Sequence, residues 1–379
     1  MSKRICAAVV ILILFLLGTN AYARPEVSAC SVIVTEKNTG RVLYEKNAEQ
    51  RMPMASTTKI MTAIAALESE IPLDDLIEIS AQAANVEGSS MYLKAGEKLT
   101  MRELLYGLML SSGNDAAVAV AEAVSGTQEE FVKLMNEKAM KIGAKNTHFT
   151  NPNGLPDDGH YSTASDMAKL TSYALSNSTF AEIVSTQVFK IDGPEKAYPR
   201  TLTNHNKLLK MYDGCKGVKT GFTKAAGRCL VSAAEREGMT LICVTLNAPD
   251  DWNDHMQLFD YAFENYKYKK IISCDVPICT AYVNGAVNTE VDVYSGCDIH
   301  FPLEEHEGYS VETEIYPGLS APLKDGEQVG RLIIEMTGRK AEIPLIVRNE
   351  VEAEHKAENF GTKIAKRIKN FFVEWLNMV

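Results

Sequence analysis

The chain has 379 residues, of which 46% are hydrophobic and 23% charged, a composition typical of a folded globular protein and not of a disordered one. This length allows a sizeable core and predicts more than one domain. With 39 Lys and Arg residues against 49 Asp and Glu residues, the net charge is −10, which argues against nucleic acid as a partner.

The N-terminus has the pattern of a secretory signal peptide. Lys3 and Arg4 precede an apolar run over residues 5–17, and the small-residue motif Ala21-Tyr22-Ala23 follows it. We therefore expect residues 1–23 to be removed as the protein is secreted across the cytoplasmic membrane. An uncleaved membrane anchor is the alternative.

Seven of the eight cysteines follow this signal, an odd number that does not suggest a disulfide framework. We expect most of them to be small buried residues, with one or two bridges as the alternative. Cys274 and Cys279 are too far apart for a tight metal knuckle, and no histidine pair beside them completes a zinc pattern. No metal site is expected.

Residues 31–34 and 41–44 are β-rich runs separated by Lys37-Asn38-Thr39-Gly40, and they predict a hairpin. After it, a buried helix is predicted to open near Ser56, because Pro53 precedes an apolar set at helical spacing. The apolar set consists of Ile60, Ala63, Ile64 and Leu67.

Ser56 and Lys59 lie three residues apart and would share one face of this helix. A desolvated lysine can lose its proton and act as the base that an alcohol nucleophile needs. Alone, the pattern also fits a helix-capping serine beside a solvated lysine, and chance supplies it about once in a chain of this length.

A second motif, Ser112-Gly113-Asn114, lies between helices predicted over residues 101–110 and 115–124. Gly113 would permit an unusual backbone in this turn, which could present both polar side chains to a cleft. Taken alone, a simple helix-breaking turn is the better interpretation. The position of the motif between two others reverses that preference.

A further amphipathic helix is predicted over residues 131–142, followed by a loop of turn-forming residues at 151–156. Ser165 is expected to cap the next helix. The histidines nearest the motifs show no metal-ligand spacing, so structural or surface roles are expected for them. They are His148, His160 and His205.

The third motif, Lys219-Thr220-Gly221, lies in a strand predicted over residues 216–223. Glycine inside a strand marks close approach by a ligand or another backbone. Strands over residues 228–234 and 239–246 would extend an antiparallel sheet, with Lys219 at one margin facing the Ser56 helix. A helix over residues 252–266 would cover the sheet.

The pattern changes near Lys269-Lys270, where short alternating runs over residues 271–347 predict a small all-β domain. Residues 350–358 read as a charged linker. Residues 362–379 combine basic residues with an aromatic apolar stripe, the pattern of a helix that lies in a membrane surface. A helix docked on the β domain is the alternative.

With these three motifs, the sequence resembles the D-alanyl-D-alanine carboxypeptidases, the low-molecular-mass penicillin-binding proteins of bacterial cell walls. The resemblance implies an α+β catalytic domain over residues 24–269, an antiparallel sheet flanked by helices plus a helical subdomain. A small β-rich domain at 270–349 and a linker with an amphipathic membrane-anchor helix at 350–379 would follow.

The resemblance also implies residue roles. Ser56 would attack the D-Ala-D-Ala carbonyl with Lys59 as base, Ser112 would relay a proton, and Asn114 would orient Lys59 and the substrate amide. In the third motif, Lys219, Thr220 and Gly221 would bind substrate, with the terminal carboxylate on Lys219 and Thr220. The backbone N–H groups of Ser56 and Phe222 would form the oxyanion hole.

Phe222 departs from relatives that carry histidine after this motif. No cofactor is implied. The implied partners are peptidoglycan stem peptides ending in D-Ala-D-Ala, β-lactam antibiotics as inhibitors, and the membrane surface through the C-terminal helix. The protein would therefore lie on the extracytoplasmic face of the membrane, peripherally anchored.

Two other functions remain open. A β-lactamase shares the triplet but deacylates with a glutamate on a loop between the second and third motifs. Glu129, Glu130 and Glu137 lie instead on a predicted helix. A non-catalytic penicillin-binding sensor or wall-binding module is the other alternative, which the intact triplet disfavours.

Overall fold

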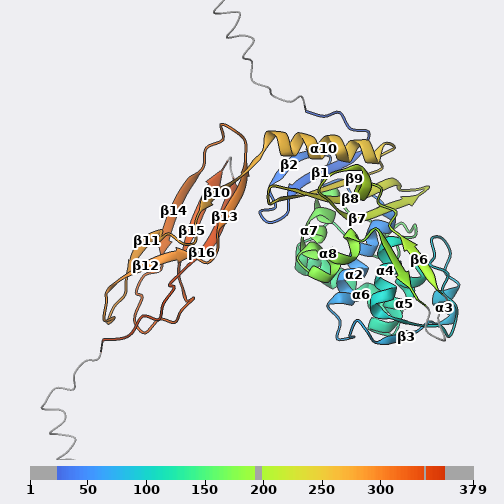
Figure 1. The fold of residues 1–379 in the computed structure, drawn as a ribbon, viewed down its shortest axis with the longest axis horizontal. Helices are drawn as coiled ribbons and strands as arrows, with labels where there is room; N and C mark the ends of the chain where they lie inside the picture. The colour runs from blue at the N-terminus through green and yellow to red at the C-terminus, as the bar shows by residue number, and fades with distance from the viewer. Residues whose placement is uncertain (1–23, 193–198, 337–338, 355–379) are drawn as a thin grey trace, which may run out of the picture. The chain divides into compact units, whose positions relative to one another are not determined.

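The computed structural model describes residues 24–192, 199–336 and 339–354. The chain divides into two compact units, one ending at Tyr268 and the other beginning at Lys269 (Figure 1). The signal sequence at 1–23 and the amphipathic segment at 362–379 lie outside the described residues.

The first unit is built on an antiparallel sheet with the strand order β2-β1-β9-β8-β7. The predicted hairpin is confirmed as β1 and β2, and the third-motif strand is the edge strand β7. The strands are β1 (Ser31–Glu36), β2 (Val42–Lys46), β7 (Cys215–Thr223), β8 (Gly227–Arg236) and β9 (Met239–Leu246).

Alternating side chains of the central strands feed two separate cores, as period-2 geometry requires. Leu230 and Cys243 pack with Phe259 of α10 (Asp251–Asn265), the helix that covers one face of the sheet. Val231 and Val244 belong to the larger core on the other face. The α+β arrangement expected for the catalytic domain is therefore present.

The helices of the larger core form a layer beneath the sheet (Figure 1). They are α2 (Lys59–Leu67), α4 (Met101–Leu110), α5 (Asn114–Ser125), α6 (Gln128–Ile142), α7 (Ala164–Leu175) and α8 (Ser178–Ser185). Shorter elements border this layer: β3 (Leu76–Glu78), α3 (Ala81–Ala84), β4 (Lys98–Thr100), β5 (Val188–Ile191), β6 (Arg200–Thr203) and α9 (Leu208–Met211).

Side-chain caps fix where four of these helices begin, α4, α6, α7 and α8. Thr100 and Glu103 form a reciprocal capping box at α4. The expectation that Ser165 caps α7 is wrong, because the side chain of Thr163 accepts the N–H of Asp166 at 3.0 Å. Ser165 instead lies inside the first turn.

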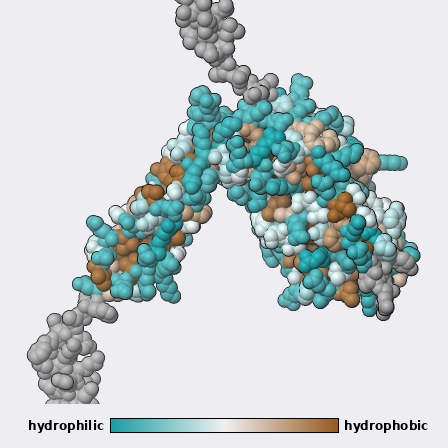
Figure 2. All heavy atoms as spheres, viewed as in Figure 1, coloured by the Kyte–Doolittle hydropathy of each residue, from teal (hydrophilic) through white to brown (hydrophobic). Residues whose placement is uncertain are grey.

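The second unit is all β, as predicted. Its main sheet has the order β11-β12-β16-β15-β14, and β10 pairs with β13. Val293, Leu332 and Leu345 are fully buried in its core, while Figure 2 shows apolar surface among its polar side chains. The strands are β10 (Lys267–Ile272), β11 (Cys279–Tyr282), β12 (Glu290–Ser295), β13 (Ile299–Leu303), β14 (Ser310–Ile315), β15 (Gln328–Met336) and β16 (Arg339–Ile346).

The seven described cysteines are all free thiols. Of these, Cys229 and Cys243 are buried, whereas Cys30 and Cys297 are exposed, so the expectation that most are buried is wrong. Within the described part of the chain, no helix combines the length and apolar character needed to cross a bilayer.

Candidate active site

The first motif lies in a tight turn that enters α2. Ser56 belongs to a 3₁₀ turn, η1 (Ala55–Thr58), and Lys59 is the first residue of the α-helix. The helix therefore opens near Ser56 as predicted, although with a tighter first turn. Lys59 Nζ lies 2.9 Å from Ser56 Oγ, so the structure brings the two side chains together.

The Lys59 amine is fully buried among three oxygen atoms. Besides Ser56 Oγ, it donates to Asn114 Oδ1 at 2.8 Å and to the carbonyl of Asn153 at 2.7 Å. Burial lowers the pKa of Lys59 well below its ordinary value, the charge of Lys219 lowers it further, and Asp115 opposes both. A neutral amine would give its two N–H bonds to Asn114 and Asn153, which leaves its lone pair for the Ser56 hydroxyl.

The second motif forms the turn between α4 and α5, but its unusual backbone lies one residue earlier than expected. Ser112 has a φ of 59°, whereas Gly113 has a φ of −57°. Gly113 is needed instead for close packing, because an added Cβ would lie 2.7 Å from Asp115 Oδ1. Ser112 itself is buried.

The start of α5 holds a neighbouring loop at the site. Asn114 donates from Nδ2 to the carbonyl of Glu87 at 2.7 Å, and its backbone N–H donates to the carbonyl of Ser89. Asp115 accepts from the hydroxyl of Ser90 and from the N–H groups of residues 91 and 93. Asn114 is therefore fixed from two sides while its Oδ1 faces Lys59.

The loop over residues 151–155 contributes a group that the sequence interpretation missed. The carbonyl of Asn153 accepts from Lys59, and Asn151 Oδ1 accepts the N–H groups of residues 153, 154 and 155. Gly154 has a φ of 87° and packs against the carbonyl of Ala55. The Asn and Gly residues signalled the turn, but the sequence does not show that a backbone carbonyl would face Lys59.

The third motif lines the same site from the edge strand. Lys219 is buried, and burial lowers its pKa to about 7; its ammonium donates to the carbonyl of Thr220 at 2.9 Å. A Cβ on Gly221 would lie 3.1 Å from Ser56 N, which places β7 directly against η1 (Ala55–Thr58), the nucleophile turn. The side chain of Phe222 is 67% exposed.

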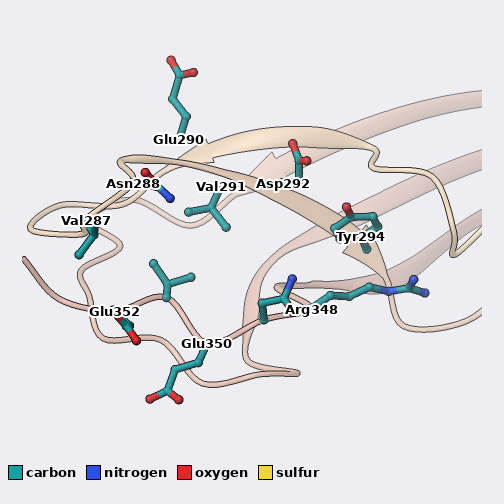
Figure 3. Close-up of a pocket in the computed structure, with 11 residues that line it drawn as sticks. Val287, Asn288, Glu290, Val291, Asp292, Tyr294, Arg348, Glu350 and Glu352 are labelled. Carbon is teal, nitrogen blue, oxygen red and sulfur yellow. The ribbon is translucent and has the colours of Figure 1, made fainter.

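Two cavities help to locate the chemistry. A cavity of about 330 Å³ borders the nucleophile turn and is lined by residues that include Ala55, Gly154, His160 and Thr223. A groove of about 380 Å³ lies in the second unit. Its lining includes several carboxylates and Arg348 (Figure 3). None of the residues lining that groove belongs to the three motifs, so the reactive groups lie in the first unit.

The glutamates that could deacylate a β-lactamase are not among the described hydrogen-bond partners of Lys59. Glu129, Glu130 and Glu137 are exposed on α6. Lys59 instead draws its described hydrogen-bond partners from Ser56, Asn114 and Asn153.

Known proteins resemble this chain in sequence and fold. A D-alanyl-D-alanine carboxypeptidase family model matches residues 18–250, and a model of the penicillin-binding protein 5 C-terminal domain matches residues 266–353. The chain is 34% identical to the D-alanyl-D-alanine carboxypeptidase DacF of Bacillus subtilis, over 86% of each chain. It is also 34% identical to DacC of Escherichia coli, over 89% of this chain and 90% of that protein.

A solved structure supports the same relationship. Penicillin-binding protein 5 from Haemophilus influenzae superposes with a TM-score of 0.74 at 28% identity, over 88% of this chain and 100% of that one. The chain therefore belongs to the D-alanyl-D-alanine carboxypeptidase family of serine peptidases.

Proposed function

We propose that this protein is a serine-type D-Ala-D-Ala carboxypeptidase that removes the terminal D-alanine from peptidoglycan stem pentapeptides. The observation that carries the proposal is the contact of 2.9 Å between the buried Lys59 amine and Ser56 Oγ. A lysine whose pKa is lowered by burial can take the serine proton as the bond to substrate forms.

In the proposed reaction, Ser56 Oγ attacks the carbonyl carbon of the penultimate D-alanine and transfers its proton to Lys59. Charge develops on the carbonyl oxygen, which the backbone N–H groups of Ser56 and Phe222 would stabilise. The C–N bond then breaks, and the leaving D-alanine amine receives a proton through Ser112. Water hydrolyses the acyl ester and restores the Ser56 hydroxyl.

We propose that substrate lies extended along β7, the edge of the sheet. An edge strand can pair with an added extended peptide through main-chain hydrogen bonds. The buried cation of Lys219, with Thr220 beside it, would then receive the terminal carboxylate. Gly221 allows the bound peptide and the nucleophile turn to approach each other closely.

A penicillin presents the amide carbonyl of its β-lactam ring, and a carboxylate on the adjoining ring, to the same groups, so β-lactam antibiotics would acylate Ser56. We further propose that the protein is secreted and held at the extracytoplasmic membrane surface. The signal-like pattern at 1–23 and the basic amphipathic pattern at 362–379 support this location.

Mass spectrometry of the purified protein after penicillin addition tests the proposal. We expect one stable adduct on the peptide that contains Ser56, hydrolysis of a diacetyl-lysyl-D-Ala-D-Ala peptide, and neither result with Ser56→Ala. Rapid loss of the adduct without peptidase activity would indicate a β-lactamase. A stable adduct without any peptide hydrolysis would indicate a penicillin-binding sensor.

A further inference from the structure

His160 belongs to none of the three motifs, yet it is buried next to the nucleophile turn, with 4% of its surface exposed. Its Nδ1 accepts the backbone N–H of Thr150 at 3.0 Å. Because that nitrogen must be an acceptor, the ring proton lies on Nε2. Nε2 is 2.7 Å from Thr58 Oγ1, so His160 donates to the threonine hydroxyl.

The direction of this hydrogen bond sets the direction of the next one. The Thr58 hydroxyl accepts from His160 and donates its own proton to the carbonyl of Ala55 at 2.8 Å. This carbonyl belongs to the peptide group that also contains the N–H of Ser56. The bond is trans, so the Ser56 N–H points opposite to the Ala55 carbonyl.

That peptide group needs support from outside. Ala55 has a φ of 48°, a left-handed conformation that is costly for a residue with a side chain. Gly154 packs so closely over the same carbonyl that an added Cβ would lie 2.0 Å from the Ala55 oxygen. Two contacts therefore hold this one carbonyl, the Gly154 backbone and the Thr58 hydroxyl.

We propose that His160 is a positioning residue for the oxyanion hole, which acts through Thr58 and the Ala55 carbonyl to aim the N–H of Ser56 at the substrate oxygen. The inference rests on the proposed function, in which that N–H receives the developing negative charge. A 1 Å displacement of such a donor is enough to slow catalysis.

The protonation state of His160 is consistent with this role. Burial lowers its pKa to about 4, Asp157 opposes the shift, and His148 and Lys59 add to it. The ring is therefore neutral near pH 7. A neutral ring is required, because a proton on Nδ1 would face the N–H of Thr150.

Two substitutions separate the two ring contacts. In His160→Gln, the side-chain amide can replace the Nε2 donor to Thr58. In His160→Asn, the shorter amide can replace the Nδ1 acceptor for Thr150 but does not reach Thr58. Thr58→Val and Thr58→Ser form a second pair, because valine removes the hydroxyl and serine keeps it.

The experiment measures the rate constant for acylation by penicillin and kcat and KM for an ester substrate. We expect His160→Asn and Thr58→Val to lower the acylation rate constant and kcat about tenfold, with KM little changed. This loss is smaller than the roughly 10²–10³-fold loss in kcat that follows removal of an oxyanion-hole donor. His160→Gln and Thr58→Ser should stay close to wild type. The double variant His160→Asn/Thr58→Val should be no slower than either single variant, because both break one chain of contacts.

A thionoester substrate, in which sulfur replaces the carbonyl oxygen, gives a readout specific to the oxyanion hole. We expect His160→Asn to slow the ester more than the thionoester, because sulfur accepts weaker hydrogen bonds. Multiplicative losses in the double variant, or equal losses in the Asn and Gln variants, would overturn the inference. If the His160 variants do not fold, Thr58→Val and Thr58→Ser decide by the same criteria. Acylation of the wild type by penicillin tests the proposed function on its own, because that result does not depend on the role of His160.

Discussion

The two buried lysines are coupled through their charges. The positive charge of Lys219 lowers the pKa of Lys59, as does the burial of Lys59 itself. Lys59 must be neutral to act as a base, so acylation should rise with pH through the pKa of Lys59. In the proposed mechanism, Lys219 therefore helps to keep Lys59 neutral, the form that acts as the base, before the substrate carboxylate binds.

Lys219→Gln tests this coupling. Removing the neighbouring positive charge should raise the pKa of Lys59, so the acid limb of the pH profile for acylation by penicillin should move to higher pH. Thr220→Val is a control at the adjacent position that keeps both lysines. A limb that stays in place or moves to lower pH would show that Lys219 does not influence the base.

Recognition of the substrate carboxylate makes a second prediction at the same residue. Amidation of the C-terminus removes the charge that Lys219 and Thr220 are proposed to bind but leaves the scissile bond unaltered. Charge-assisted hydrogen bonds are worth about 1.5–3 kcal/mol each, so amidation should lower kcat/KM at least tenfold. Lys219→Gln should shrink this preference. Equal processing of both peptides by the wild type would favour an endopeptidase that cuts inside cross-links.

At the scale of elements, the loop over residues 151–155 is locked against the nucleophile turn. Gly154→Ala should destabilise the protein and slow acylation, because a Cβ there would lie 2.0 Å from the Ala55 oxygen and 2.9 Å from Ser56 N. Gly40→Ala is the matched control, since Gly40 also has a positive φ but has nothing within 4 Å of a Cβ.

For the control we expect a loss of about 1–2 kcal/mol from the left-handed backbone alone, with acylation unchanged. The melting temperature and the rate of acylation by penicillin measure both effects. If Gly154→Ala behaves like Gly40→Ala, the contact between the loop and the nucleophile turn does not control the site.

Long periodic segments were predictable to within three residues at their ends, whereas the turns that build the site were not. The helix predicted from the apolar spacing of residues 101–110 has the same bounds as α4, and β7 is one residue longer than its predicted span. Ser56 and Lys59 were identified because helical spacing alone puts them on one face. The Lys59 partner in Asn153 was missed, because a backbone carbonyl leaves no mark in the sequence.

The same limit explains the errors at Gly113 and Ser165. From the sequence alone, an unusual backbone conformation is expected at glycine. The surrounding structure instead holds Ser112 at a φ of 59°, and Gly113 is needed for close packing. Several hydroxyl residues precede α7, and only tertiary placement selects Thr163 as the cap. A structural or surface role was expected for His160 for a related reason. Its hydrogen-bond partner, the Thr58 hydroxyl, is remote from it in sequence.

At the scale of the whole molecule, buried neutral histidines make stability depend on pH. Burial lowers the pKa of His160 to about 4 and that of His255 to about 3, whereas a histidine in the unfolded chain titrates near 6.5. Between these values the unfolded chain binds protons that the folded protein does not. Stability should therefore be full above pH 6.5 and fall as the pH is lowered toward 4.

His160→Gln should flatten this dependence. The wild-type contribution of His160 over this range is about 3 kcal/mol, so the drop in melting temperature between pH 7 and pH 4.5 should be smaller in the variant. His306→Gln replaces an exposed histidine of the second unit and serves as the control. An unchanged drop in His160→Gln would mean that His160 is protonated in the folded protein in this range.

The proposed location at the membrane rests on parts of the sequence outside the described residues. Deleting residues 362–379 should release the protein from membranes without loss of acylation, because this segment carries apolar and basic residues but none of the motif residues. Replacing Phe371, Phe372 and Trp375 with serine should release it as well, while Glu358→Gln in the preceding linker should not. If the truncated protein still sediments with membranes after signal cleavage, the anchor lies elsewhere in the chain.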